Sequence, residues 1–275
     1  MIIDAHQHFW KPSRGDYGWL TPELELLYRD FLPRDLKPLL DSCGVEKTIL
    51  VQAAPTRAET EFMLELAREH EFIAGVVGWI DFEAADAAAQ IGDLSGDPLL
   101  LGLRPMIQDI PDVDWILRSQ NEAAFAAMVN HHLVFDALVL PIHLKNLLSV
   151  VVRFPDLRVV IDHAAKPSIR TGVQESWFRE MEDLAQHPQV SCKVSGLVTE
   201  AGPDWKPGDL TPVIDHLIAV FGPNRLIWGS DWPVLNLAGD YGQWFEVANE
   251  ALQECTETDR SAVFGGNAER IYLTP

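Results

Sequence analysis

Two histidines near the start of the chain have the spacing of paired ligands or paired catalytic groups. His6 and His8 are two residues apart, so on a β-strand both side chains point to the same face. Two imidazoles on one rigid face can bind one metal ion or contact one substrate oxygen. The pair alone suits structural histidines as well, so the interpretation depends on the groups that the fold brings beside it.

A third histidine and an aspartate follow two other short apolar runs. His163 comes directly after residues 158–162, and Asp231 follows the run 226–228. An aspartate beside imidazoles can take a proton from water or bind a metal ion. Asp231 also precedes a Trp-Pro step, where an aspartate often serves as a turn or helix-cap residue. The three histidines nevertheless favour a functional role for Asp231.

Two cationic residues also follow apolar runs. Arg104 ends the run 99–104 and Lys193 lies near the end of the run 190–194. Either side chain can hold a carbonyl oxygen or a developing oxyanion, so we predict that both contact the substrate. A salt bridge to a neighbouring carboxylate is an equally good interpretation of each residue alone.

Nine tryptophans are many for 275 residues. Trp10, Trp79 and Trp232 fall on or just past the ends of apolar runs, where aromatic faces suit a polyhydroxylated ring. We therefore predict that these three contact the substrate, although any one of them could equally fill a core. Trp228 lies within a run and is assigned to the core.

These residues need a scaffold that gathers the ends of many strands. Near-continuous apolar runs alternate with amphipathic or alanine-rich segments along the whole chain, a pattern typical of parallel strands covered on both faces. The predicted strands span residues 2–6, 48–52, 72–79, 99–104, 134–140, 158–162, 190–194 and 226–228. The predicted helices span residues 57–70, 84–94, 121–131, 142–154, 174–187 and 211–221.

Eight predicted strands, with helical segments between most of them, predict an α/β fold, a (β/α)8 barrel of the TIM type, with residues 1–275 as one domain. In such a barrel the site lies where the strands end, and that is where the residues above fall. A doubly wound open sheet is the alternative, but it would want a glycine-rich turn where Gln7 and His8 stand. The irregular stretch 9–32 follows the first strand and is long enough to suggest a functional loop.

Charge and composition restrict the partners. The formal net charge is −20, which disfavours nucleic acid and anionic membranes as partners. No CxxC motif, targeting segment or long apolar stretch is present, so we expect a cytoplasmic protein with reduced, mostly buried thiols at Cys43, Cys192 and Cys255. The oligomeric state is left open, a homo-oligomer included.

The strand-end motifs together resemble the amidohydrolase superfamily. The resemblance is to its branch of sugar-lactone and pyrone hydrolases, and within that branch to the L-fuconolactonases. It extends in order over residues 2–273. The motifs are IDAHQHFW (3–10), GLR (102–104), DHAAKP (162–167), KVSGL (193–197), WGSDWP (228–233) and FGGNAER (264–270).

The resemblance implies a distorted barrel that hydrolyses the ester of an aldonolactone, with His6, His8, His163 and Asp231 as catalytic residues. In the mechanism that it suggests, Asp231 activates water and the histidines polarise the carbonyl. No cofactor is strictly required, but one divalent metal ion such as zinc would bind His6, His8 and Asp231. Members with two metals carry a lysine or glutamate where Arg104 stands, so a two-metal site is not expected.

Three other functions stay open at this point. The first is hydrolysis of a different lactone, such as L-rhamnonolactone, L-galactonolactone or a pyrone dicarboxylate. The second, a decarboxylase, would need a firm metal site. The third is a non-catalytic sugar-binding barrel. The tryptophans favour a sugar lactone as the small-molecule substrate.

Overall fold

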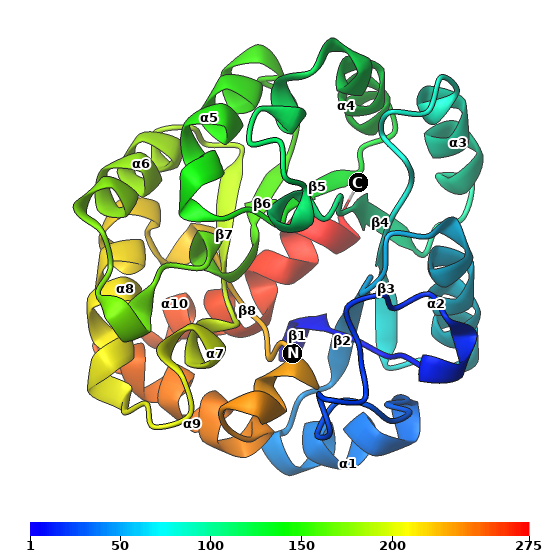
Figure 1. The fold of residues 1–275 in the computed structure, drawn as a ribbon. Helices are drawn as coiled ribbons and strands as arrows, with labels where there is room; N and C mark the ends of the chain where they lie inside the picture. Colours follow the sequence, from blue (N-terminus) through cyan, green and yellow to red (C-terminus); the bar gives the residue numbers. More distant parts are fainter. Residues whose placement is uncertain (275) are drawn as a thin grey trace.

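A computed structural model describes residues 1–274 and confirms the predicted barrel. Its eight strands are parallel and pair in sequence order from β1 to β8 (Figure 1). They are β1 Ile3–Gln7, β2 Lys47–Val51, β3 Ile73–Gly78, β4 Leu100–Leu103, β5 Val134–Ala137, β6 Val159–Ile161, β7 Val190–Val194 and β8 Leu226–Trp228.

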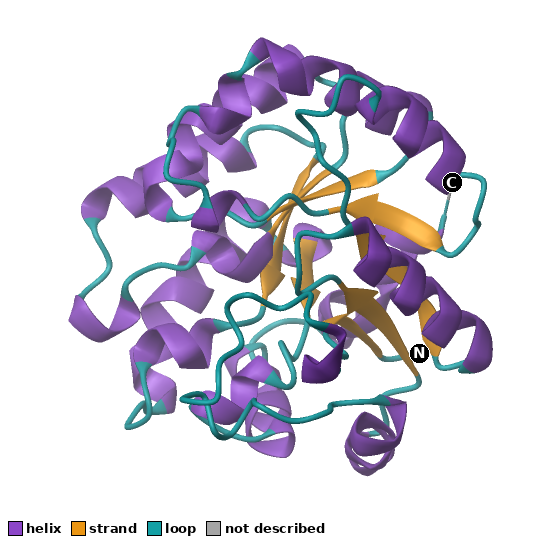
Figure 2. Ribbon diagram, turned by 45° about the vertical axis from the view of Figure 1, so that its right-hand side comes forward, coloured by secondary structure: helices purple, strands orange, loops and turns teal. Residues whose placement is uncertain are grey.

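Helices surround the strands on all sides (Figure 2). They are α1 Pro33–Cys43, α2 Arg57–Glu69, α3 Ala87–Leu94, α4 Glu122–Asn130, α5 Leu144–Arg153, α6 Glu175–Ala185, α7 Leu197–Ala201, α8 Pro207–Phe221, α9 Tyr241–Ala251 and α10 Glu257–Ser261. Among residues 1–274, no helix has both the length and the apolar character needed to span a bilayer.

The first and last strands meet, and their contact places the N-terminal histidines beside Asp231. The backbone N–H of His8 donates to the carbonyl of Trp232 (2.7 Å), and the N–H of Asp231 donates to the carbonyl of His6 (2.8 Å). The pairing of β1 with β2 is irregular between Asp4 and Gln7. Such an irregularity re-aims side chains, and here Asp4 accepts a hydrogen bond from Tyr241 of α9 while His6 points into the barrel.

Apolar side chains fill the barrel interior, and the C-terminal segment closes one of its ends. Ile3, Val77 and Ile227 form a buried cluster with Ile271 and Tyr272 of the C-terminal helical turn Glu269–Leu273. Figure 1 shows this segment, in red, passing behind the strands. Polar groups also reach this end of the interior, because the Tyr272 hydroxyl donates to buried Asp136, which contacts Lys193.

A second apolar layer separates the strands from the helices. Trp228 is fully buried there and packs its ring against Tyr241, Phe245 and Phe264, which confirms its assignment to the core. The expectation of mostly buried thiols is wrong, because only Cys192 is buried while Cys43 and Cys255 are partly exposed. All three are free cysteines, as predicted.

Two differences from the predicted elements have local causes. Helix α1 was not predicted, because Pro33 and Pro38 interrupt its helical pattern. In the structure Pro33 occupies the first turn, where proline is tolerated. The Asp35 carboxylate caps this turn by accepting a hydrogen bond from the N–H of Leu32. Strand β5 ends at Ala137 rather than at residue 140, and the short 3-10 helix Pro141–His143, which begins with a proline, follows it.

The stretch 9–32 is irregular, as predicted, and lies against the barrel. Trp10 and Phe31 pair their backbones at its two ends, with both N–H···O distances at 3.0 Å. Within it, the Trp19 indole donates to the carbonyl of Ala53 (2.7 Å), just past β2. The loop therefore forms a wall beside the strand ends.

Candidate active site

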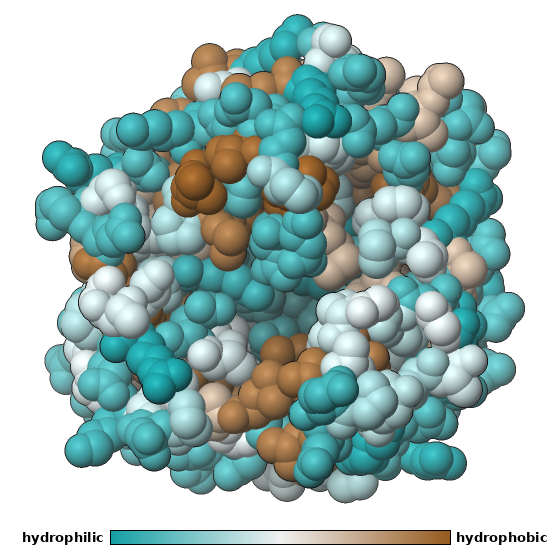
Figure 3. All heavy atoms as spheres, viewed as in Figure 1, coloured by the Kyte–Doolittle hydropathy of each residue, from teal (hydrophilic) through white to brown (hydrophobic). Residues whose placement is uncertain are grey.

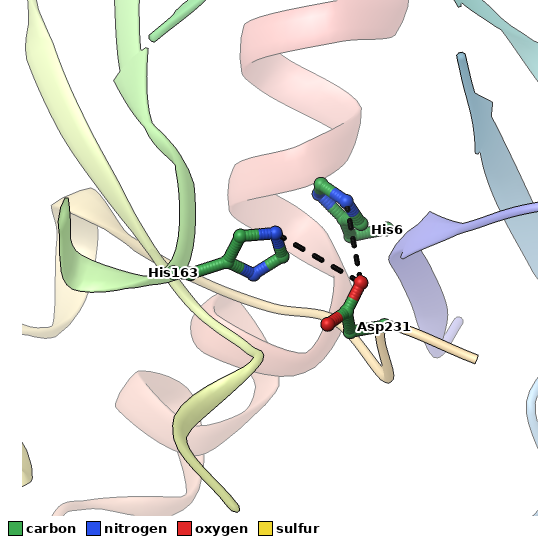
Figure 4. A group of neighbouring side chains, drawn as sticks. All are labelled: His6, His163 and Asp231. Atoms are coloured by element: carbon green, nitrogen blue, oxygen red, sulfur yellow. Dashed lines mark ion pairs between the residues drawn. The ribbon is translucent and has the colours of Figure 1, made fainter. Parts of the chain in front are cut away.

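The carboxylate of Asp231 is the centre of the site. Its Oδ1 lies 3.2 Å from Nε2 of His8, 3.7 Å from Nε2 of His6 and 3.8 Å from Nε2 of His163. Figure 4 shows the imidazoles of His6, on β1, and of His163, on the turn Asp162–Ala165 that follows β6, both directed at this oxygen. The structure thus brings together all four residues that the sequence predicted as catalytic.

The hydrogen bonds of His8 determine which of its nitrogens carries the proton. Its Nδ1 is 2.7 Å from the carbonyl oxygen of Val51, which can only accept, so Nδ1 holds the proton. In the tautomer with its proton on Nδ1, the Nε2 lone pair of His8 faces the carboxylate oxygen of Asp231. Two acceptors face one another at 3.2 Å, and that arrangement calls for a proton or a metal ion between them.

The buried ion pair of Arg104 and Asp162 orients the imidazole of His6. Its Nε2 lies 3.3 Å from the Arg104 guanidinium, which can only donate, and its Nδ1 lies 3.4 Å from Asp162. These neighbours select the tautomer with the proton on Nδ1. Arg104 itself contacts Asp162 (3.2 Å) and both the side chain and the carbonyl of Gln52.

Burial and charge set the protonation of the cluster. Burial lowers the pKa of His6 well below its ordinary value, and it lowers the pKa of His163 to about 4 against the pull of Asp231. Burial alone would raise the pKa of Asp231, but the three surrounding histidines lower it below its usual range. Around neutral pH the site therefore presents neutral His6 and His163 beside an ionised carboxylate.

The backbone around His163 adopts an uncommon conformation. Four successive non-glycine residues, 163–166, have φ between 51° and 58°, and Asp231 has φ 59°. Left-handed backbone costs about 1–2 kcal/mol per L-residue, so surrounding contacts must hold it. The Trp177 indole donates to the carbonyl of Ala164 (2.8 Å), and the Ser195 hydroxyl lies 2.9 Å from Nδ1 of His163.

The donor set fits a divalent metal ion. One ligand atom from each of His6, His163 and Asp231 lies within 4.8 Å of the others, and all three residues are buried. Two imidazole nitrogens and one carboxylate oxygen are zinc-type ligands, and the lone pair of His8 faces the same carboxylate oxygen. The predicted set of His6, His8 and Asp231 differs from this trio in one member.

The two predicted cations have different environments. Arg104 lines the pocket above the cluster, although its guanidinium is committed to Asp162 and Gln52. Lys193 is fully buried; it contacts Asp136 and lies 3.1 Å from Asp162. In this conformation the prediction of Lys193 as a substrate contact is not met, because its ammonium compensates two buried carboxylates.

The three tryptophans predicted to contact the substrate also lie in different environments. Trp10 is buried and donates to the carbonyls of Leu27 and Arg29, and buried Trp232 packs against Phe9 and Phe31. Both fill the core beneath the loop instead of lining the pocket, as happens where large aromatic rings meet at a strand end.

A cavity of about 280 Å³ lies over the cluster. His8, Arg104, His163, Lys166 and Asp231 line one part of it, and apolar side chains line the rest. The apolar residues are Trp19, Leu24, Leu27, Ala53, Met106, Leu138, Val234 and Leu237. Figure 3 shows the hollow near the centre of this face.

A larger cavity of about 500 Å³ adjoins the first, with Trp19, Met106 and Asp109 in both linings. Trp79 lines this neighbouring cavity together with Phe82 and Trp115. Of the three predicted aromatic contacts, only Trp79 therefore reaches a cavity at the strand ends.

Several residues of the site were not predicted as site residues. Asp162 precedes His163 and was visible at a strand end, but nothing in the sequence distinguished it from a strand-terminal turn residue. Gln52 and Trp19 gave no signal, because an isolated glutamine or loop tryptophan has no spacing to indicate a role. Their positions follow from the closure of the barrel and the path of the loop.

Comparison with known proteins agrees with the strand-end motifs. The model of the amidohydrolase family matches residues 3–273. An L-fucono-1,5-lactonase of Burkholderia ambifaria is 48% identical over 274 residues, covering 98% of this chain and 94% of the relative. An L-fucono-1,5-lactonase of Burkholderia multivorans is 37% identical over 287 residues, with 99% and 96% covered.

Solved structures also show similarity to amidohydrolases. An amidohydrolase from Burkholderia multivorans, crystallised with bound HEPES and with bound zinc, superposes with a TM-score of 0.93 at 35% identity over the full length of both chains. The resemblance inferred from the motifs is thereby confirmed. With a family match over nearly its whole length, this chain belongs to the amidohydrolase family.

Proposed function

We propose that this protein hydrolyses a sugar lactone, L-fucono-1,5-lactone or a stereochemically similar aldonolactone, to the aldonic acid. The observation that carries the proposal is the Asp231 carboxylate surrounded by His6, His8 and His163 at the floor of a pocket. The coarser statement, that the chain is a hydrolase acting on a cyclic ester, follows from its family and its two lactonase relatives.

Asp231 serves as the general base. Its carboxylate is ionised at neutral pH and lines the pocket, so a water molecule beside it can pass a proton to the carboxylate while attacking the lactone carbonyl carbon. The carbonyl π electrons move onto the carbonyl oxygen as the new C–O bond forms. A positioned base of this kind contributes about 10²–10⁴-fold to the rate.

The oxyanion needs donors that are already in place. When Ser195 donates to Nδ1 of His163, the proton of that imidazole is on Nε2, which faces the pocket and can donate to the oxyanion. The intermediate then collapses and breaks the ring C–O bond. Asp231 returns the proton to the leaving ring oxygen, so the products are a hydroxyl group and an acid.

A metal ion suits the same groups. His6, His163 and Asp231, with His8 beside them, would hold one divalent ion such as zinc, which when bound polarises a carbonyl and lowers the pKa of a bound water. Binding the ion through Nε2 would require His163 to carry its proton on Nδ1 and to donate it to Ser195, while Asp231 still moves the proton of water and Asp162 orients the imidazole of His6.

The pocket favours a neutral sugar over a dicarboxylate. A pyrone dicarboxylate would need at least two free cations, but Arg104 is paired with Asp162, and Lys193 is buried with Asp136. Within residues 1–274, Lys166 is the one cation of the lining that makes no ion pair. The volume of about 280 Å³ is adequate for a single six-carbon lactone.

The test is proton release by the purified protein from a panel of lactones, with spontaneous hydrolysis subtracted. The panel holds L-fucono-, L-galactono- and L-rhamnonolactone and a pyrone dicarboxylate. The proposal expects the highest kcat/KM for L-fuconolactone or a stereochemical neighbour and little turnover of the dicarboxylate. Binding without turnover would instead support a sugar-binding barrel, and preference for the dicarboxylate would overturn the substrate assignment.

A further inference from the structure

Lys166 is a cation at the pocket wall that has no partner of its own. Its side chain lines the same cavity as His163 and Asp231, and no carboxylate oxygen among residues 1–274 lies within 4.0 Å of its ammonium group. The protein carries a net charge of −20, so carboxylates are abundant. An ammonium that stays unpaired in this setting is available to a ligand.

The backbone holds Lys166 in place at a conformational cost. Lys166 ends the left-handed turn that begins at His163, and its N–H donates to the carbonyl of His163 (2.8 Å). A right-handed turn here would send the two side chains in other directions. Strained backbone of this kind clusters at functional sites, where it fixes the placement of particular groups.

The neighbouring charges indicate what such a ligand must be. Asp231 and Asp109 are the acidic residues of the lining, and the guanidinium of Arg104 is committed to Asp162. Ester hydrolysis turns a neutral carbonyl into an oxyanion and then into a carboxylate. Negative charge therefore develops beside the Asp231 carboxylate and requires a cation on the pocket wall.

We propose that the Lys166 ammonium binds the carbonyl oxygen of the substrate as it becomes an oxyanion and then one oxygen of the aldonate carboxylate. This inference rests on the proposed lactonase function and adds a catalytic residue to it. Lys166 donates hydrogen bonds to this oxygen and transfers no proton. As the ring C–O bond breaks, the same oxygen, now part of the product carboxylate, keeps its hydrogen bond from Lys166.

A simpler role for Lys166 would be to neutralise Glu200 of helix α7. Burial raises the pKa of Glu200, and the charge of Lys166 opposes that rise, but the two side chains form no ion pair. A purely neutralising lysine would become dispensable once Glu200 is made neutral. A lysine that binds the oxyanion would still be needed, and this difference separates the two roles.

The experiment combines turnover with binding of the product. For wild type, Lys166→Met, Lys166→Arg and Lys166→Met/Glu200→Gln, kcat and KM are measured on L-fuconolactone, and the affinities for L-fuconate and neutral L-fucose are measured by calorimetry. We expect Lys166→Met to lower kcat about 10²-fold with little change in KM. It should also weaken fuconate binding while leaving L-fucose binding unchanged. Lys166→Arg should retain part of both, and Glu200→Gln should rescue neither.

Lys145→Met is the matched control, because Lys145 is an exposed lysine on helix α5. Should Lys166→Met fail to fold, Lys166→Gln removes the charge with a polar side chain. Unchanged fuconate affinity in the folded variant, or rescue by Glu200→Gln, would overturn the inference. A wild-type protein that neither hydrolyses the lactone nor binds fuconate would instead contradict the proposed function.

Discussion

Nε2 of His8 lies 3.2 Å from Oδ1 of Asp231, although 223 positions separate the two residues in the chain. The contact exists because the first and last strands close the barrel through backbone hydrogen bonds at these same residues. It also places an imidazole lone pair against an ionised carboxylate, since the proton of His8 is donated to Val51. Barrel closure therefore brings this imidazole and this carboxylate together in the site.

Gly196 allows His163 to occupy its position. A Cβ on Gly196 would lie 2.6 Å from Nδ1 of His163, and the φ of this glycine is +65°. We expect Gly196→Ala to displace the imidazole and to lower kcat/KM by at least about 10²-fold.

Gly44→Ala is the matched control for this prediction. Gly44 has φ +67°, but nothing lies within 4 Å of its virtual Cβ, so its substitution carries the backbone strain without the clash. It should lose stability and keep its activity. Equal losses of kcat/KM in the two variants would show that contact with His163 is not the cause.

Lys193 should act through Asp162 instead of through the substrate. Its ammonium contacts Asp136 and lies 3.1 Å from Asp162, which in turn lies 3.4 Å from Nδ1 of His6. Lys193→Met leaves buried Asp136 without its cation and leaves Asp162 with Arg104 alone, so we expect the free energy of unfolding to fall by about 3–5 kcal/mol and kcat to fall as well.

The control for Lys193 is Lys145→Met, which breaks an exposed pair with Glu180 worth about 0–1 kcal/mol. Adding Asp136→Asn to Lys193→Met should recover part of the lost stability, as measured by urea unfolding. If Lys193→Met changed KM alone and left the stability intact, direct substrate contact would be the better interpretation.

Much of this site could be predicted from the sequence, because each catalytic candidate lies at the end of an apolar run or within three residues of it. His6, His8, His163 and Asp231 needed only the rule that barrel sites lie at the carboxyl ends of strands. The role of Lys193 could not be predicted from the sequence, since its pairing with Asp136 depends on which residues of different strands face the barrel interior at the same height. The same limit applies to Trp10, whose burial is decided by the path of the loop 9–32.

Zinc binding should distinguish the observed trio from the predicted one. We expect the metal-stripped protein, after equilibration with zinc and gel filtration, to retain about one ion per chain, as a site with three protein ligands does. His163→Ala, His6→Ala and Asp231→Ala should lose the ion.

The control for zinc binding is His143→Ala, which removes a buried histidine whose Nδ1 accepts a hydrogen bond from the N–H of Leu140. It should retain zinc. Loss in His8→Ala together with retention in His163→Ala would favour the set His6, His8 and Asp231 instead.

Glu59 should make the stability depend on pH. Its carboxylate accepts the backbone N–H groups of Ala53 (3.0 Å) and Ala54 (2.7 Å), and burial raises its pKa from 4.5 to about 8. The folded state then binds more protons than the unfolded state between these values, so stability falls as the pH rises through this window.

We expect the Tm of the wild-type protein to fall between about pH 5 and about pH 8, and the fall to be several degrees smaller in Glu59→Gln. Thermal unfolding of both proteins in matched buffers measures this difference. Identical changes in Tm would show that Glu59 ionises without penalty in the folded state.

The central claim is that the Asp231 carboxylate moves the proton during lactone hydrolysis. The most direct measurement is proton release from L-fucono-1,5-lactone by wild type and by Asp231→Asn, each checked for folding and zinc content. The asparagine keeps the size of the side chain but cannot accept the proton, so kcat should fall by about 10²–10⁴-fold while the pocket still binds the lactone. Turnover near the wild-type rate in a folded Asp231→Asn protein would contradict the account.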